Sequence, residues 1–473
     1  MARFSPLMAS LPLLISLMSA TFQAQANNQL PDIGTAGVAA LPIEQEVRYG
    51  NAFMRFARAG LPIIDDPVLS EYIDDLGQRL LTNADGVRFP FTFFLINDPS
   101  INAAAFLGGR VKVHTGLFLY ADNESELASV LAHEITHVTQ RHIARYMEAQ
   151  ASSSAMTLAG LVGSIALAVI NPTAGIAALQ TTLGLSMQSA INYTRDNEYE
   201  ADRIGMKTLY DAGFDPMGMA SFFQKLAAEY RYASKPPEML LTHPLPETRI
   251  SEARARAGSY GRRALPPSLD FWLAKVRIQV RYGTESPQAL LTYFDSRLQK
   301  GDYPLKDAAT YGKALALLQL KRTDEADTLM QGLAARHPED LFVVDALTDI
   351  DLAKGRSAQA IARLERFRTR MPDNEVVVVN LGNAYLEGGN YQKSIAILDP
   401  YAREHDENSL AWSLLSDAYR KAGRMTDLHM ARAETLSLRG DYQAAIDELI
   451  VARGTTSDKL TLARIEARIT QLE

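Results

Sequence analysis

Hydrophobic and polar residues follow two different periods in the first third of the chain. Between Ile43 and Leu81 apolar residues recur at every third or fourth position, which predicts helix. The run FPFTFFLI at 89–96 is rich in aromatic and β-branched residues, and Arg110–His114 alternates as a half-exposed strand does, after the turn at Gly108-Gly109. We expect these two strands to pair. We interpret the second as an edge to which an extended peptide can add by main-chain hydrogen bonds.

A further helix and a long apolar segment follow. Asn123 fits a helix N-cap, with Glu126 at the third helical position, and apolar residues keep a helical spacing to about Met147. The segment 155–191 is almost without charge, and Asn171-Pro172 divides it into two apolar pieces, each near or below the length of a minimal membrane span. We interpret it as a helical hairpin packed on the rest of its domain. The alternatives are a surface that dips into a membrane or one that covers the active site.

Beyond about Pro266 the pattern becomes a helical repeat of 34 residues. Three columns keep this step along the chain: Gly355, Gly389 and Gly423; Asp340, Asn374 and Asn408; Tyr385 and Tyr419. The period is that of tetratricopeptide helix pairs, which bury their apolar faces only by stacking on the next pair. We expect about four such units, the first degenerate, with the glycines at the turn inside each pair and Leu436–Leu472 as a terminal cap.

Composition narrows the class of protein. Hydrophobic residues make up 47% and charged residues 22% of the chain, close to the averages of globular proteins. A net charge of −7, from 48 basic and 55 acidic side chains, argues against nucleic acid as a partner, because no basic excess exists to neutralise phosphates. The chain contains no cysteine, so it forms neither disulfides nor a cysteine-linked lipid anchor.

The first residues predict export. Arg3 precedes an apolar run from Leu7 to Met18, and Ala24-Gln25-Ala26 offers small residues at the cleavage positions. We read residues 1–26 as a signal peptide and 27–42 as an N-terminal extension, with the periplasm as the destination. A retained membrane anchor is disfavoured, because the run is shorter than the roughly 20 residues needed to span a bilayer.

The motif His133-Glu134-Ile135-Thr136-His137 is the strongest chemical signal. Two histidines four residues apart lie one turn apart on a helix, so both rings can face one cation, and zinc suits two imidazoles best. Glu134, beside the first ligand, is placed to accept a proton from an attacking water and pass it to the leaving amine. With 8 histidines in the chain, a chance occurrence is rare.

A catalytic zinc needs a third protein ligand, and Glu198 is the candidate. Glu198 and Asp202 share a helix face, whereas Glu200 and Asp196 point elsewhere if Glu198 faces the metal. Asp202 can then accept the ring N–H of a zinc-bound histidine and fix its tautomer. Spacing alone leaves open an ordinary solvated acidic face.

Among the remaining histidines only His243 is a candidate for chemistry. Pro244 and Pro246 hold a non-helical loop that presents it, so it can stabilise an oxyanion, occupy the open position of the metal, or simply pack. The others are expected to serve surface or packing roles: His142, half a turn from the ligand face; His114, on a strand surface; His337, His405 and His429, in the repeats.

The residues HEITH, a long gap and then EYEAD resemble the HtpX-like and CAAX-prenyl-protease superfamily of gluzincin metallopeptidases, whose pattern is HExxH followed by ExxxD on a later helix. Asn102-Ala103 and Gly108-Gly109 resemble its edge-strand region, and Thr242–Arg249 resembles its later His-Pro motif. The resemblance implies an α+β, mostly helical, gluzincin-like zinc metalloprotease domain at 43–262. An α-solenoid of tetratricopeptide repeats at 266–473 would follow it.

The order of signal peptide, protease domain and repeats is similar to that of periplasmic members of Gram-negative bacteria. This resemblance implies one zinc per chain and activity on misassembled outer-membrane β-barrel proteins. It also implies a chaperone-like role in barrel assembly, with contact between the repeats and the assembly machinery and room for peripheral membrane contact. The competing hypothesis is an assembly chaperone or scaffold whose metal site is vestigial or latent.

Overall fold

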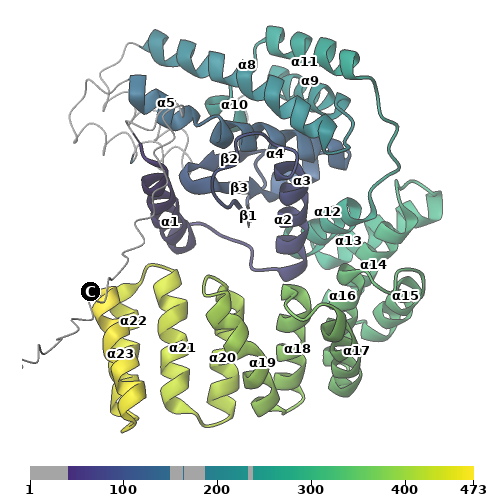
Figure 1. The fold of residues 1–473 in the computed structure, drawn as a ribbon. Coiled ribbons are helices and arrows are strands. Elements are labelled where there is room, and N and C mark those ends of the chain that lie inside the picture. The colour runs from purple at the N-terminus through teal and green to yellow at the C-terminus, as the bar shows by residue number, and fades with distance from the viewer. Residues whose placement is uncertain (1–40, 150–162, 164–186, 233–237) are drawn as a thin grey trace, which may run out of the picture. The chain divides into compact units, whose positions relative to one another are not determined.

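The computed structural model describes residues 41–149, 163, 187–232 and 238–473 (Figure 1). The expected signal peptide, nearly all of the N-terminal extension and most of the apolar segment 155–191 lie outside these residues. The described residues all belong to one unit, which spans Gly37–Glu473. Mostly helices, with one small sheet, make up the part before residue 262, as predicted. Its elements are α1 (Ile43–Gly60), α2 (Pro67–Leu81), β1 (Thr92–Ile96), β2 (Ala103–Phe106), η1 (Leu107–Gly109), β3 (Arg110–His114), α3 (Thr115–Tyr120), α4 (Glu124–Thr139), α5 (His142–Ala149), α8 (Met187–Asp211), α9 (Met217–Tyr232), α10 (Glu238–Thr242) and α11 (Glu247–Tyr260).

The helix predicted over 43–81 is two helices, so this prediction was wrong in its middle. Helix α1 ends at Gly60, and an extended stretch follows in which Ile63 pairs with Ile96 at the end of β1. Helix α2 then begins at Pro67, where a proline costs no hydrogen bond, and the Asp66 carboxylate caps it by accepting the Leu69 N–H. Helical periodicity continued across the break because the extended stretch is also buried on one face.

The sheet confirms the predicted pairing but not the predicted edge. Its order is β1-β3-β2, with β1 parallel and β2 antiparallel to β3. The strand at Arg110–His114 is therefore central. The edge nearest α4 is β2, at Ala103–Phe106, in the region that resembled the family's edge strand. Sequence reasoning missed β2 because three consecutive alanines carry no alternation of polar and apolar residues.

The helix predicted from Asn123 to about Met147 is also broken. The Asn123 side chain caps α4 as expected by accepting the Glu126 N–H at 3.1 Å, but α4 ends at Thr139 and α5 begins at His142. Between them Arg141 adopts a left-handed backbone conformation with φ 54°. Its buried guanidinium bonds the Glu46 carboxylate at 2.8 Å, which ties this turn to α1. A long-range ion pair thus redirects the chain.

Close packing sets the position of α8 on α4. A Cβ atom on Gly205 would lie 3.0 Å from the Ala132 carbonyl oxygen, so the two helices can approach this closely only with glycine there. Ala132 precedes His133, and Gly205 lies on the same helix as Glu198. The glycine contact therefore brings the HEITH helix and the EYEAD helix together.

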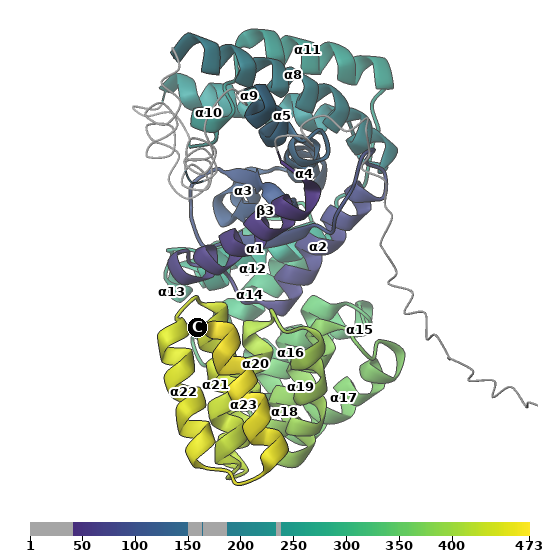
Figure 2. The ribbon, with the colours of Figure 1, turned by 60° about the vertical axis from the view of Figure 1, so that its left-hand side comes forward.

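From residue 269 onward the chain is a series of antiparallel helices, which stack side by side in both views of the ribbon (Figures 1 and 2). They are α12 (Leu269–Tyr282), α13 (Pro287–Lys300), α14 (Lys306–Gln319), α15 (Thr323–Arg336), α16 (Leu341–Ala353), α17 (Ser357–Arg370), α18 (Glu375–Glu387), α19 (Tyr391–Glu404), α20 (Ser409–Lys421), α21 (Met425–Leu438), α22 (Tyr442–Gly454) and α23 (Lys459–Leu472).

The 34-residue columns have clear structural roles. The side chains of Asp340, Asn374 and Asn408 each cap the first helix of a pair by accepting a backbone N–H of its first turn. The predicted turn glycines, Gly355, Gly389 and Gly423, have φ values of 68°, 75° and 73° and join the two helices of each pair. The repeat prediction is confirmed at these positions, since only glycine adopts such φ values at little cost.

A buried group of charges connects α2 to the repeats. Arg277 of α12 donates to Asp66 at the start of α2 (2.7 Å) and to the Tyr311 hydroxyl (3.0 Å), and it lies 2.7 Å from Asp345 of α16. The side chain of Arg277 is 1% exposed. We call Asp66, Arg277, Tyr311 and Asp345 the junction cluster.

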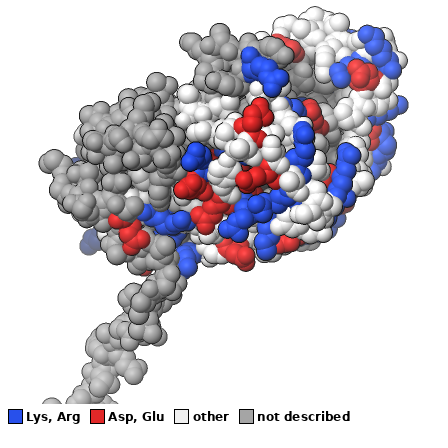
Figure 3. Space-filling model, turned by 90° about the horizontal axis from the view of Figure 1, so that it is seen from above, with Lys and Arg blue, Asp and Glu red and all other residues white. Residues whose placement is uncertain are grey.

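The surface of the described residues carries both signs of charge. On the face in Figure 3, Lys and Arg are interspersed with Asp and Glu and form no single-sign field. Among the described helices, none combines the length and apolarity that a membrane crossing requires.

Candidate metal centre

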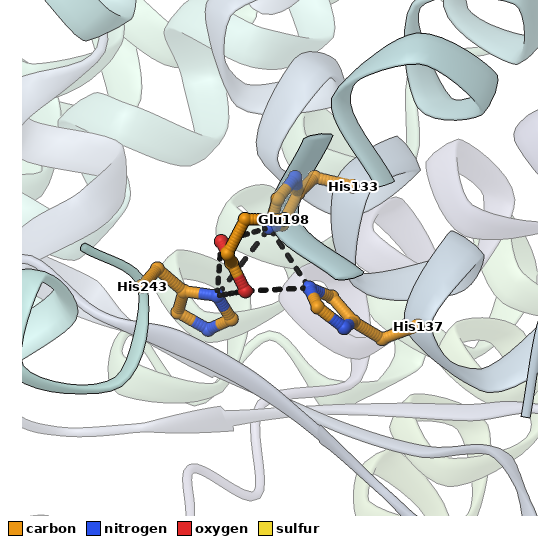
Figure 4. A group of neighbouring side chains, drawn as sticks. All are labelled: His133, His137, Glu198 and His243. Atoms are coloured by element: carbon orange, nitrogen blue, oxygen red, sulfur yellow. Dashed lines mark hydrogen bonds and ion pairs between the residues drawn. The ribbon is translucent and has the colours of Figure 1, made fainter. Parts of the chain in front are cut away.

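The centre is built on α4, which is buried along almost its whole length. One helical turn separates His133 from His137, and their Nε2 atoms lie 3.0 Å apart (Figure 4). The spacing of the motif therefore does what the sequence predicted, because two ring nitrogens face one point.

Helix α8 adds a carboxylate at that point. The two oxygens of Glu198 divide between the histidines: Oε2 lies 3.3 Å from His133 Nε2, and Oε1 lies 3.3 Å from His137 Nε2. Glu200 and Asp196 are not part of this group. The structure thus brings the three predicted ligands together.

The fourth member is His243, in the loop between α10 and α11. Its Nδ1 lies 3.1 Å from Glu198 Oε1 and 3.3 Å from His133 Nε2. One ligand atom from each of His133, His137, Glu198 and His243 can be chosen so that all lie within 4.8 Å of one another. His243 therefore belongs to the same group of possible metal ligands.

Glu134 lies next to the group formed by His133, His137, Glu198 and His243, on the side that faces the sheet. Its Oε2 accepts the Ala105 N–H of β2 at 2.9 Å, and its Oε1 lies 3.3 Å from His243 Nε2. Within the described residues Oε1 accepts no hydrogen bond although it is buried. Burial raises the pKa of Glu134, which suits a group that must take up a proton.

Asp202 and Arg249 form a second layer behind the ligands. Asp202 Oδ1 lies 3.0 Å from His133 Nδ1, on the side of the ring away from the cluster. Arg249 donates two hydrogen bonds to Asp202 (2.7 and 2.8 Å) and one to the Pro244 carbonyl (2.6 Å), and it lies 2.9 Å from Glu198. One arginine therefore contacts Asp202, Glu198 and the loop of His243.

Sequence reasoning did not select Arg249, although it ends the quoted segment Thr242–Arg249. A signal was present, because the segment follows an acidic motif and an arginine buried beside carboxylates is the usual way to neutralise them.

Electrostatics favour positive charge between the ligands. Burial alone would raise the pKa of Glu198, but the imidazoles of His243, His137 and His133 hold it well below its usual range. The pKa of His133 rises to about 10, because its bonds to Asp202 and Glu198 outweigh burial. Burial lowers the pKa of His137 to about 4, so this ring is neutral and keeps a free lone pair.

The donor set fits a zinc ion. Imidazole nitrogens and one carboxylate are the ligands of catalytic zinc sites. The Nε2 atoms of His133 and His137 and the two oxygens of Glu198 are turned to a common point. The buried Glu134 Oε1 beside them provides a further acceptor next to that point.

Two other histidines differ from the expectation. His114 is buried rather than on a strand surface, with its Nδ1 2.9 Å from Ser100 Oγ, and burial lowers its pKa to about 4. His142 does not lie half a turn away from the ligands. The break at Arg141 turns it back, so that its Nδ1 lies 2.8 Å from His137 Nδ1. In the repeats, His337 and His429 pair with Asp307 and Glu448.

Comparison with known proteins gives two kinds of match. The profile of peptidase family M48 matches residues 67–257, which include His133, His137, Glu198 and His243. Tetratricopeptide repeat profiles match residues 308–340 and 351–418.

Relatives match across both parts of the chain. A beta-barrel assembly-enhancing protease of Yersinia pestis is 50% identical over 340 residues, which cover 72% of this chain and 70% of that protein. One of Escherichia coli is 46% identical over 345 residues, covering 73% and 71%. A putative one of Vibrio cholerae is 54% identical over 322 residues, covering 68% and 66%. The chain belongs to peptidase family M48, as a metalloprotease with tetratricopeptide repeats after its peptidase domain.

Proposed function

We propose that the chain is a zinc-dependent endopeptidase in which His133, His137 and Glu198 hold the metal and Glu134 is the general base. The observation that carries the proposal is the convergence of two Nε2 atoms and one carboxylate on a single point. Zinc bound there supplies Lewis acidity, which polarises a peptide carbonyl and makes water a stronger nucleophile at neutral pH.

The residues around the ligands have separate tasks. Glu134 accepts the proton of the attacking water and returns it to the leaving nitrogen, a role helped by its raised pKa. Asp202 Oδ1, 3.0 Å from His133 Nδ1, favours a proton on that nitrogen, so that the lone pair of His133 Nε2 is available to the metal. Arg249 is a positioning residue that holds Asp202 and Glu198 in register.

A substrate would bind along β2. Asn102 O accepts the His114 N–H, so the backbone groups of Ala103 and Ala105 point away from β3. Ala105 donates its N–H to Glu134 Oε2, so an extended peptide paired with this edge would lie beside the proposed base. This position replaces the edge at Arg110–His114 that the sequence suggested.

The substrates we propose are misassembled outer-membrane β-barrel proteins, which the chain degrades and whose assembly it also assists. Support comes from the names of the relatives, which are beta-barrel assembly-enhancing proteases, and from the affinity of unfolded β-strands for a free sheet edge. The repeats offer a surface for docking substrate or the assembly machinery. We further propose a periplasmic location, a signal peptide at 1–26 and domain limits at 43–262 and 266–473.

Glu134→Gln tests this proposal, because an amide keeps the shape of the side chain but cannot accept a proton. The variant should bind one zinc per chain and lose hydrolysis of an unfolded barrel protein by at least about a hundredfold. Undiminished cleavage would place the base elsewhere. Full support of barrel assembly in cells by this variant, without cleavage, would instead favour the chaperone or scaffold hypothesis.

His243 supports a latent form of the same enzyme. Because its ring lies among the ligands, we propose that it is a fourth ligand in the resting state, and that substrate or a partner moves its loop. An oxyanion-stabilising role would place the ring nearer the substrate than the metal.

A further inference from the structure

The two ligand histidines of α4 are supported in different ways. Behind His133 the partner is the Asp202 carboxylate, at 3.0 Å. Behind His137 the partner is another imidazole: the Nδ1 atoms of His137 and His142 lie 2.8 Å apart. Figure 4 shows this second nitrogen of His137 turned away from the cluster. An imidazole nitrogen, unlike a carboxylate oxygen, can donate or accept a hydrogen bond. A further contact of His142 must therefore set which of the two Nδ1 atoms donates.

The carboxylate of Glu200, on α8, sets the direction of this hydrogen bond. His142 Nε2 lies 3.2 Å from Glu200 Oε2, and Arg145 Nη1 donates to the same oxygen at 2.7 Å. A carboxylate only accepts, so the proton of His142 belongs on Nε2 and its Nδ1 is left as an acceptor. His137 must then donate from Nδ1, which leaves the lone pair on its Nε2, the atom that faces Glu198.

We propose that His142 is a positioning residue for zinc, which together with Glu200 and Arg145 selects the metal-binding tautomer of His137. The opposite arrangement, with His142 Nδ1 donating, would place the proton of His137 on Nε2 and direct an N–H at the metal position. This inference rests on the proposed ligand set and extends it by a chain of three side chains.

A packing role alone does not explain the contacts of His142. His142 is buried, and packing of α5 on α4 would be served by any side chain of similar volume. Packing alone does not require a ring nitrogen at 2.8 Å from a ligand, a carboxylate behind it and an arginine behind that carboxylate. The break at Arg141 is what makes the contact possible, because residues five apart do not face each other on a continuous helix.

Two variants of equal shape separate tautomer selection from packing. Asn and Leu share the same branched heavy-atom skeleton, and the Asn Oδ1 atom can sit where His Nδ1 sits. His142→Leu should weaken zinc binding by roughly 10- to 100-fold, as loss of such support does elsewhere, whereas His142→Asn should stay within about threefold of wild type. The measurements are the zinc dissociation constant, from competition with a chromophoric chelator, and the visible spectrum of the Co²⁺-substituted protein.

Further variants keep the result decisive. Glu200→Ala alters a partly exposed side chain and should weaken zinc several-fold even if His142→Leu fails to fold. His429→Leu removes a matched imidazole–carboxylate pair in the repeats and should leave zinc affinity unchanged. Equal affinities in the Leu and Asn variants, or wild-type affinity in Glu200→Ala, overturn the inference. If wild type itself binds no zinc, or His137→Ala still binds it, the proposed ligand set fails instead.

Discussion

The metal centre and the junction cluster both bury charged side chains, but they satisfy them differently. In the junction cluster Arg277 lies between Asp66 and Asp345, so positive and negative groups alternate and neutralise one another. In the metal centre one ring nitrogen from each of His133 and His137 and the carboxylate of Glu198 are turned toward one point. Buried charge alone therefore does not indicate a catalytic or metal site. Side-chain atoms that can bind a metal and that converge on one point do indicate such a site.

The largest expected effect tests the metal side of this comparison. His137→Ala removes one of the converging acceptors, so zinc should be lost and peptide hydrolysis should fall by at least about a thousandfold, or ~4 kcal/mol. Elemental analysis and a cleavage assay on an unfolded barrel protein measure both. Stoichiometric zinc in the variant would show that the ligands are assigned wrongly, and His429→Ala is the control.

Arg277→Met should affect stability and leave the metal alone. Arg277 is the cation in closest contact with Asp66 and Asp345, since Arg281 lies 4.0 and 3.9 Å from them. Removing it leaves these buried carboxylates with only the more distant charge of Arg281, at a cost of about 3 kcal/mol in the free energy of unfolding. Urea denaturation measures this, and the zinc dissociation constant should not change. Arg281→Met, at a side chain that is 26% exposed, is the control with a smaller loss. A stable Arg277→Met protein would remove the contrast between the two clusters.

His243→Ala asks whether the fourth member of the metal centre is a ligand or a catalyst. As a resting-state ligand it restrains the enzyme, and its loss should raise basal proteolysis roughly tenfold, equivalent to ~1.4 kcal/mol. An oxyanion-stabilising role predicts a fall of about a hundredfold or more. Initial rates on an unfolded β-rich protein decide the sign, and unchanged rates would leave His243 with a packing role only.

The smallest effect concerns Glu71, a carboxylate on α2, the helix that Asp66 of the junction cluster caps. Burial raises the pKa of Glu71 to about 7, although a hydrogen bond from Asn374 opposes this. As the pH rises from about 4.5 to 7 the unfolded chain loses the proton first, so stability falls through this window. Glu71→Gln should therefore stabilise the protein by about 1 kcal/mol at pH 8, after allowance for partial exposure, and by nothing near pH 4.5. Thermal unfolding at the two pH values measures the difference, with the exposed Glu285→Gln as control; an equal gain at both values would contradict it.

Local signals predicted most of the fold. The repeat register followed from the glycines and caps, because a left-handed turn and an N-cap each demand particular residue types at fixed spacing. The breaks at Leu61–Asp66 and at Arg141 could not be predicted in this way. They depend on partners far along the chain, such as Glu46 and Ile96, whereas helical periodicity reports only which face is buried.

In the candidate site, too, some residues could be predicted from local sequence and others depend on contacts between distant segments. His133, Glu134 and His137 follow from motif spacing on one helix, whereas Glu198 and Asp202 needed the family resemblance in addition to their spacing. The structure places all of these residues close together. His142 was expected to have a surface or packing role, because a continuous helix was assumed. The roles of Arg249 and Glu200 depend on tertiary contacts between α8 and its neighbours, which no spacing within one segment encodes.

The left-handed residue at Arg141 also limits how the centre can be copied into another protein. A transplanted helix equivalent to 124–139 would carry both imidazoles and Glu134 in the right phase, yet it would lack the turn that returns His142 to His137. That turn is secured by Glu46, 95 residues upstream. A portable unit therefore needs at least α1, α4, α5 and α8, and a grafted HEITH helix alone should hold zinc more weakly than the parent.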